Sequence, residues 1–384
     1  MGRSLPKIAL MLGNIAIGLA VLAPAGMLAE LARDLHVGIH DTGLLVTYGA
    51  VVLCISSPLG AWLTTRIDRR LLLVSTILIL AAGEALTAIA PSYGVILTLR
   101  LVLLAAAALY TPQAAATVAL IVPEKERPSA IAFVFLGWSL AIAGGLPMVT
   151  FLTAQFGWRI AYAALGALGF AICVLLRFAL PKGLKGNPLS LGSFGTIATT
   201  ASTAFILLIT LLTTSGQFTV MVYLAPLLEK LTGQGPATAG LFFGILGGMG
   251  FIGNIIATSI VPRLGVQLTF ALFLASISFG GVLWALGSGA VTVMGIGVGF
   301  WGLGFAASNS MQQARLAQAA PALASASIAL NTSLLYVGQA VGSGIGGLLI
   351  AHDIFKAQGY VAIAFMAVAA LVLALTWERR SKTG

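Results

Sequence analysis

The chain has 384 residues, of which only 8% are charged and 59% are apolar, and its mean hydropathy is +1.06. Soluble domains carry roughly 25% charged residues, so this composition excludes a water-facing surface and indicates a protein surrounded by lipid. The net charge of +10 does not indicate nucleic-acid binding, because the basic residues cluster in the short gaps between apolar runs.

Apolar runs of roughly 18–28 residues recur along the chain, each long enough to cross about 30 Å of hydrocarbon. Proline, glycine or charged residues separate them. The sequence therefore predicts an all-α membrane protein with transmembrane helices near residues 6–31, 43–65, 70–90, 94–122, 129–152, 158–180, 200–228, 236–261, 266–287, 290–312, 321–350 and 358–377.

The first run follows Arg3 and Lys7 and is too long for the apolar region of a signal peptide, so we interpret it as the first span. Solvated loop charge is the simplest interpretation of the polar segment after it. A proton antenna is the alternative, because histidine titrates near neutrality. This segment contains Glu30, Asp34, His36, His40 and Asp41.

Two charged residues lie inside predicted spans, Glu84 in the third and Arg100 in the fourth. Charges within hydrocarbon cost about 2.5–3.5 kcal/mol each on insertion scales, so both are candidates for function. At 1.5 Å per residue both lie about 9 Å below the outer face. We consider three alternatives: Glu84 binds a proton whose affinity depends on its neighbours, it forms a static ion pair with Arg100, or the two do not touch.

The distribution of basic residues orients the spans. With the N-terminus in the cytoplasm, fifteen of the 20 lysines and arginines fall in inner segments, Arg315 among them, and four in outer segments. This excess predicts that both termini are cytoplasmic and that the number of spans is even.

The two halves of the chain are alike. Leu-Ala-Pro ends both the first and the seventh run, and a proline followed by a Ser/Ala/Ile segment comes after both the fourth and the tenth. These matches predict two six-helix repeats around a central path. We expect an N-terminal bundle over residues 1–180, a cytoplasmic linker over 181–199 and a C-terminal bundle over 200–384.

Several segments resemble the major facilitator superfamily over essentially the whole chain, in particular its twelve-span drug:proton antiporters and their arabinose-efflux-permease-like branch. They are the loop GAWLTTRIDRR at residues 60–70, Arg100, the glycines and proline at 137–147, and residues 216–226. The loop has Thr65 where the family signature has an acid. The resemblance implies two six-helix bundles that enclose a cavity, with Arg100 facing it, and a gating loop made of Arg66, Asp68, Arg69 and Arg70.

Uncharged polar and aromatic side chains inside the runs are further candidates for contacts with a substrate, although such groups also bond to neighbouring helices in hydrocarbon. Besides Arg100, the candidate cavity residues are Tyr48, Tyr110, Gln113, Trp138, Gln217, Phe218, Tyr223, Asn254, Trp301, Asn309, Asn331, Tyr336 and Gln339.

No HExxH, CxxC, GxSxG or GxxxxGK[ST] string occurs, so we expect a secondary transporter without cofactor or metal rather than an enzyme. The few acids inside spans disfavour a cationic substrate. We expect export of a small neutral or anionic molecule, a drug or sugar-like metabolite, in exchange for protons. Uptake by symport or facilitated diffusion is the alternative, and an intramembrane hydrolase is a third class. We expect a monomer in a bacterial inner membrane, with no nucleic-acid partner.

Overall fold

The computed structural model describes residues 4–64, 67–123, 126–184, 195–197, 199–320 and 324–381, which form helices and short connections without a strand. The N-terminal half comprises α1 (Ser4–Leu22), η1 (Ala23–Gly26), α2 (Leu28–Asp34), α3 (Ile39–Leu63), α4 (Arg69–Ala88), α5 (Tyr93–Ala107), α6 (Tyr110–Ile121), α7 (Arg127–Leu140), η3 (Ala141–Gly145), α8 (Leu146–Phe156) and α9 (Trp158–Ala179).

The C-terminal half comprises α11 (Ala201–Met221), α12 (Leu224–Thr232), α13 (Pro236–Leu286), α14 (Val291–Ala319), α15 (Ala324–Ala351) and α16 (Ala357–Ser381). Most of the predicted linker, residues 185–194 and 198, lies outside the described residues.

Eleven helical segments of the described chain are long and apolar enough to cross a membrane, and one of them, α13, has 51 residues. A helix of that length would extend about 77 Å, more than twice the hydrocarbon thickness. Gly265 interrupts it with a φ of 73°, a left-handed conformation that glycine adopts without strain. The segment is therefore two spans that meet at Gly265, and the described chain has twelve spans, as predicted.

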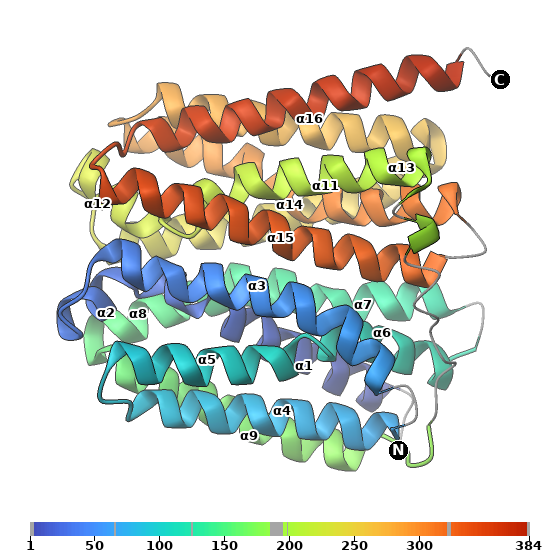
Figure 1. The fold of residues 1–384 in the computed structure, drawn as a ribbon, viewed down its shortest axis with the longest axis horizontal. Coiled ribbons are helices and arrows are strands. Elements are labelled where there is room, and N and C mark those ends of the chain that lie inside the picture. The colour runs from blue at the N-terminus through green and yellow to red at the C-terminus, as the bar shows by residue number, and fades with distance from the viewer. Residues whose placement is uncertain are drawn as a thin grey trace.

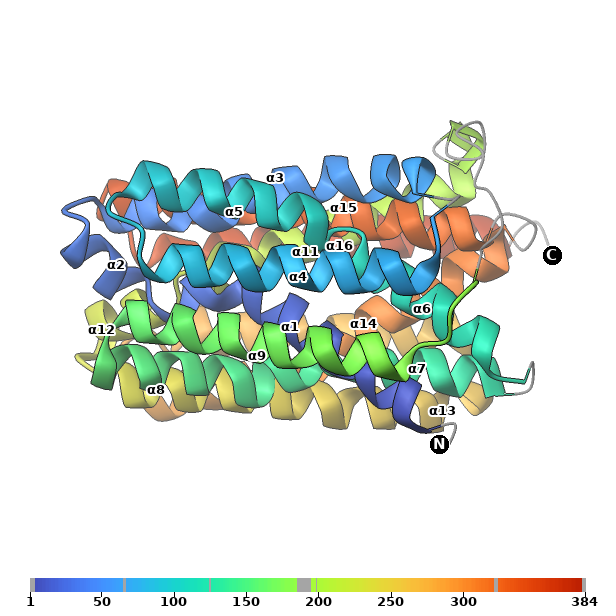
Figure 2. The ribbon, with the colours of Figure 1, turned by 90° about the horizontal axis from the view of Figure 1, so that it is seen from below.

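The two halves of the chain lie next to each other, with α3 and α15 side by side along the boundary between them (Figure 1). The beginning of α1 and the end of α16 lie at the same end of the molecule, in this view and in the perpendicular one (Figure 2). We call this the termini end, and we call the opposite end, where α2 and α12 lie, the far end. Termini on one side require an even number of spans.

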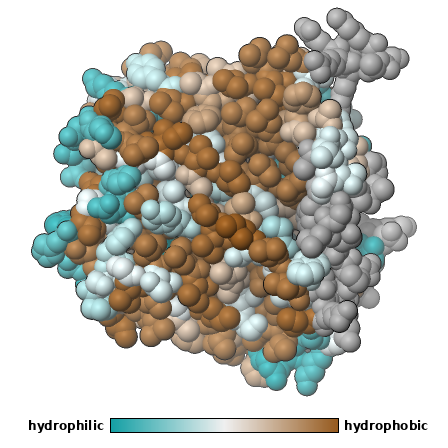
Figure 3. Space-filling model, in the orientation of Figure 1, coloured by the Kyte–Doolittle hydropathy of each residue, from teal (hydrophilic) through white to brown (hydrophobic). Residues whose placement is uncertain are grey.

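The surface is apolar along the length of the helices, and polar residues gather at the far end (Figure 3). Large apolar side chains such as Phe178 and Leu286 are 75% and 71% exposed. Such a surface is stable only when lipid covers it.

Prolines interrupt several spans. Pro24 lies in the short 3₁₀ segment η1, Pro112 follows the break between α5 and α6, and Pro147 follows the π-helical turn η3. Proline has no N–H to donate to the carbonyl four residues earlier, which breaks the α-helical pattern. Helix breaks therefore accompany these three prolines, whereas α3 continues through Pro58.

Asp34 connects three segments at the far end. Its carboxylate accepts hydrogen bonds from the indole Nε1 of Trp158, at 2.8 Å, and from the guanidinium of Arg159. Arg159 also donates to the carbonyl of Ala90, at 3.3 Å. The hydrogen bond from Arg159, followed by that from Trp158, holds the pKa of Asp34 below its usual range.

We expect the Asp34→Asn variant to unfold at a lower temperature than the wild type at pH 7. Because the folded-state pKa of Asp34 lies below the unfolded value of about 3.9, the carboxylate stabilises the fold above that pH, and the stabilisation is lost as the pH falls through the folded pKa. The difference between the variants should shrink as the pH falls below about 3.9. Thermal unfolding in detergent at several pH values tests this, with the exposed Glu229→Gln as control.

Candidate functional site

The two halves meet closely at the far end along α3, α11 and α15. Tyr223, which connects α11 to α12, is fully buried, and its hydroxyl donates to the carbonyl of Ser343 at 3.1 Å. The same hydroxyl lies against Gly43 of α3, where an added Cβ would be 2.1 Å from the phenolic oxygen. The side-chain oxygens of Thr47 and Ser343 are 2.8 Å apart. The far end is therefore closed along this line of contact, which we call the α3–α15 seam.

A second contact joins the halves where η3 packs against α13. Because Pro147 cannot donate to the carbonyl of Ala143, the chain forms the wider π-helical turn Ala141–Gly145. An added Cβ at Gly247 of α13 would lie 2.2 Å from the backbone nitrogen of Ala143. Beyond this contact a cleft of about 440 Å³ opens between α8 and α13, and its lining includes Phe151, Gln155, Pro236 and Leu241.

Arg100 is 2% exposed and donates to three backbone carbonyls. Its Nε bonds to Leu45 at 2.9 Å, Nη1 to Ala20 at 2.9 Å and Nη2 to Val21 at 2.7 Å. Ala20 is four residues before Pro24, so its carbonyl has no α-helical partner. Arg100 thus supplies the hydrogen bonds that the break in the first span removes, and it joins that span to α3.

Glu84 on α4 is 1% exposed, and neither of its carboxylate oxygens has a hydrogen-bond partner. Arg100 acts on it electrostatically, but the two form neither a hydrogen bond nor a salt bridge. The hydroxyl of Tyr162 on α9 is also buried without a partner, and both charged groups act on it. Of the three alternatives, the static ion pair is therefore not formed in this conformation, and proton binding by Glu84 stays a prediction.

A chain of polar side chains crosses the N-terminal half. Trp138 donates through Nε1 to the hydroxyl of Thr111 at 3.3 Å, and Thr111 donates to Asn14 at 2.8 Å. Tyr110 is fully buried and donates to the carbonyl of Leu10 at 3.3 Å. Asn14 was not among the candidate residues. Its isolated amide in an otherwise apolar first span is the signal that would have identified it.

The loop before α4 is attached to the segment after α9. Asp68 accepts a hydrogen bond from the N–H of Leu71, at 3.1 Å, which caps α4. It also accepts one from the N–H of Gly183, at 2.6 Å. Arg66, the first predicted gating residue, lies outside the described residues.

The other two predicted gating residues bond within the N-terminal half. Arg69 is buried, and its guanidinium donates to the side-chain oxygen of Gln113, while its N–H donates to the carbonyl of Leu184 at 2.9 Å. Arg70 donates to the carbonyl of Arg177. Gln113, predicted to face the cavity, is therefore engaged by the predicted gating loop in this conformation.

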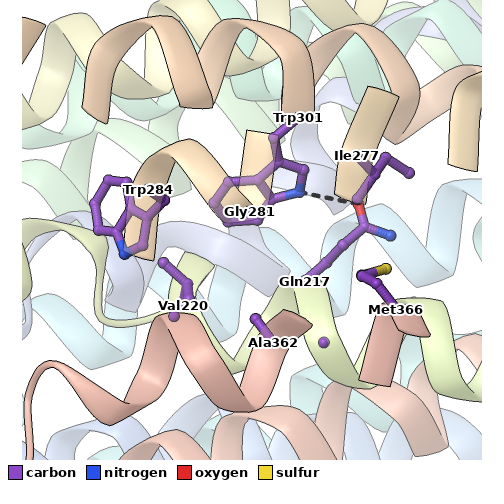
Figure 4. Close-up of a pocket in the computed structure, with 10 residues that line it drawn as sticks. Gln217, Val220, Ile277, Gly281, Trp284, Trp301, Ala362 and Met366 are labelled. Atoms are coloured by element: carbon purple, nitrogen blue, oxygen red, sulfur yellow. Dashed lines mark hydrogen bonds between the residues drawn. The ribbon is translucent and has the colours of Figure 1, made fainter. Parts of the chain in front are cut away.

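A small apolar pocket of about 20 Å³ lies in the C-terminal half, between α11, α13, α14 and α16 (Figure 4). Trp301 donates through Nε1 to the side-chain oxygen of Gln217 at 3.2 Å, and the amide nitrogen of Gln217 donates to the carbonyl of Thr213 at 3.2 Å. Trp284 and Met366 also line the pocket. Gln217 and Trp301 are cavity candidates from two different spans, and they form a hydrogen-bonded pair.

Three more candidates lie in the C-terminal half, on spans 8, 10 and 11. Asn331 accepts a hydrogen bond from Thr210 at 2.7 Å and donates to Asn309 at 3.3 Å. Asn254 accepts one from Ser310 at 3.0 Å. These bonds connect α11, α13, α14 and α15 through uncharged polar groups.

Arg315 is predicted to lie in an inner connecting segment, but the structure places it on a helix. The helix α14 continues to Ala319, and Arg315 is only 5% exposed. Its guanidinium donates to Gln312 at 2.5 Å and stacks over the ring of Phe270, 4.8 Å from the centroid. Arg315 is therefore a buried cation of the C-terminal half.

The remaining candidates have mixed environments. Phe218 packs on Phe305 with ring centroids 6.4 Å apart, and Tyr336 is buried. Gln339 is 1% exposed and its side-chain nitrogen has no partner. Tyr48, by contrast, is 44% exposed on α3.

Comparison with known proteins places this arrangement among transporters. The family model of the Major Facilitator Superfamily matches residues 10–343. The inner membrane transport protein YdhP of Escherichia coli K12 is 28% identical, with 98% of this chain and 96% of that protein covered. A probable sugar efflux transporter of Mannheimia succiniciproducens is 26% identical, with 94% and 90% covered.

Solved structures share the fold. A D-xylose-proton symporter matches with a TM-score of 0.76 at 16% identity, over 96% of both chains. A bacterial homologue of the lysosomal transporter Spinster, in an inward-facing and unoccupied conformation, matches with a TM-score of 0.71 at 14% identity, over 97% of this chain and 96% of that one. The chain therefore belongs to the Major Facilitator Superfamily, as a multi-pass membrane transporter and not an enzyme.

Proposed function

We propose that this transporter exports a small neutral or anionic molecule, of which a sugar-like metabolite is the leading class, in exchange for protons. Two six-helix units, residues 1–180 and 200–384, rock about the path between them, and residues 181–199 connect them on the cytoplasmic side. The termini end faces the cytoplasm, because most of the basic residues of the connecting segments fall on that side. The transporter acts as a monomer.

The proposed substrate class rests on the uncharged polar side chains of the C-terminal spans. Gln217, Trp301, Asn309 and Asn331 offer amides and indoles, which suit a hydroxylated neutral molecule. Glu84 is the one acid of the described chain that lies well inside a span, so a cationic substrate would lack a counter-charge. The name of the Mannheimia relative, a probable sugar efflux transporter, supports the same class and direction.

Purified protein in sealed vesicles tests the proposal. Pentoses and hexoses are first screened for thermal stabilisation of the protein in detergent. A sugar that stabilises it is then added outside vesicles that contain a pH-sensitive dye. Antiport predicts that the lumen becomes more alkaline as the sugar enters. Uptake by symport, the mode named for the D-xylose-proton symporter, predicts acidification, and sugar entry without proton movement would overturn both coupled modes.

We expect Gln217→Leu to raise the KM for the transported sugar about tenfold, because a lost hydrogen bond to a neutral group is worth about 1 kcal/mol and a buried partner is left unpaired. Concentration-dependent uptake into vesicles measures this. Gln318→Leu, at an exposed position of α14, is the matched control. An unchanged KM in the Gln217 variant would remove that residue from the substrate site.

A further inference from the structure

Two buried polar groups lie close to Arg100 in the far-end part of the N-terminal half, and neither has a hydrogen-bond partner. Glu84 is four residues from the end of α4, and Tyr162 is in the second turn of α9. Both side chains are almost fully buried, with exposures of 1% and 0%. An unpaired carboxylate or hydroxyl inside a membrane protein is costly and calls for a functional reason.

Arg100 does not remove the cost of burying an unpaired Glu84 carboxylate. Arg100 is committed to the carbonyls of Ala20, Val21 and Leu45. Among the described residues, Arg100 is the charged group that acts electrostatically on Glu84, and Tyr162 on α9 is a titratable group on which both charges act. A charged Glu84 without a direct partner is therefore strongly disfavoured, whereas the neutral acid is tolerated.

We propose that Glu84 carries the exchanged proton, that it is protonated in this conformation, and that Arg100 is the positioning residue through which loss of the proton reaches the α3–α15 seam. The proposal rests on the proton antiport proposed above and names the residues that couple it. Release of the proton to water converts the neutral acid into a carboxylate. No other bond is made or broken.

The carboxylate then attracts Arg100 and competes with the three carbonyls for its donors. Two of these carbonyls belong to the last turn of α1, before the Pro24 break, and the third is that of Leu45 on α3. Leu45 lies between Gly43 and Thr47, two of the α3 residues that contact the C-terminal half at the seam. A shift of Arg100 thus acts on the segment of α3 that closes the far end.

Tyr162 completes the proton site as an uncharged donor. Its hydroxyl is the other unpartnered group beside Glu84, and it can donate a hydrogen bond to the carboxylate once the proton has left. This bond would stabilise the deprotonated state. Proton release in the Tyr162→Phe variant should therefore occur at a higher pH than in the wild type.

The α3–α15 seam provides the readout. In a Cys54→Ala, Cys173→Ala background, cysteines replace Thr47 and Ser343, whose side-chain oxygens are 2.8 Å apart, and an oxidant cross-links them in vesicles. Thiol oxidation itself depends on pH, so the measured quantity is the cross-linking yield divided by that of the same protein with Glu84→Gln. We expect this ratio to fall severalfold as the pH rises, because residue 84 can lose a proton in the protein with Glu84 and cannot in the Glu84→Gln protein.

The exposed Glu229→Gln serves as control and should keep the pH dependence of the parent protein. Equal yields with and without the Glu84→Gln substitution at every pH would overturn the coupling role of Glu84. The vesicle assay separates this failure from the failure of antiport. If the wild type moves protons against sugar and Glu84→Gln moves as many, only the present inference is wrong. If the wild type moves none, the proposed antiport is wrong.

Discussion

In the Arg100→Met variant, we expect most of the transport activity to be lost and the free energy of unfolding to fall by about 3 kcal/mol or more. Methionine fills a similar volume but donates no hydrogen bond, so the carbonyls of Ala20, Val21 and Leu45 lose their side-chain donor inside the membrane. Each hydrogen bond to a charged group contributes about 1.5–3 kcal/mol. Thermal unfolding in detergent and sugar uptake into vesicles measure the two effects.

Two further substitutions make this expectation specific. Arg33, whose side chain is 77% exposed at the far end, provides the matched control, and Arg33→Met should change neither stability nor uptake appreciably. Arg100→Lys keeps the charge but not the planar arrangement of donors, so its stability should fall between those of the wild type and Arg100→Met. If Arg100→Met were as stable as the wild type, Arg100 would not be what supports the break in the first span.

The number of spans and the positions of their breaks were predictable because both depend on local features of the sequence. Apolar length defines a span, and a missing N–H at Pro24, Pro112 or Pro147 interrupts it wherever it occurs. The boundary between spans 8 and 9 was also predicted. The backbone breaks at Gly265, inside the gap of residues 262–265 between the predicted spans, because glycine tolerates the positive φ, whereas Pro262 lies within the helix.

The partners of the buried charges were not predictable, because they depend on how the helices pack. Depth alone placed Glu84 and Arg100 at the same level, but not whether they would face each other. The carbonyls of the turn before Pro24 accept hydrogen bonds from Arg100, so they compete with Glu84 for its donors. This competition depends on the packing of the first span against α5, which the sequence does not give. Arg315 was misplaced for a related reason, since an arginine near a helix end is ordinarily solvated and only the packed structure shows it over Phe270.

In the Gly247→Val variant, we expect the transport rate to fall at least tenfold while the protein still folds. An added Cβ at Gly247 would lie 2.2 Å from the nitrogen and 2.4 Å from the Cα of Ala143, and backbone atoms cannot move aside as a flexible side chain can. The two halves must therefore separate where η3 packs against α13. The rate of sugar uptake at saturating concentration measures the loss, and size-exclusion chromatography in detergent verifies folding.

The neighbouring glycine provides the control, since an added Cβ at Gly248 would have nothing within 4 Å. Gly248→Val should therefore transport at nearly the wild-type rate, although both substitutions carry the same cost in helix propensity. A rate loss confined to Gly247 would show that the close approach of α13 to the π-helical turn is required for transport, and equal rates would show that it is not. Pro147 helps to form this contact. With another residue at position 147, its N–H would bond to the carbonyl of Ala143, and the backbone there would follow an ordinary α-helix instead of the π-helical turn that packs against Gly247.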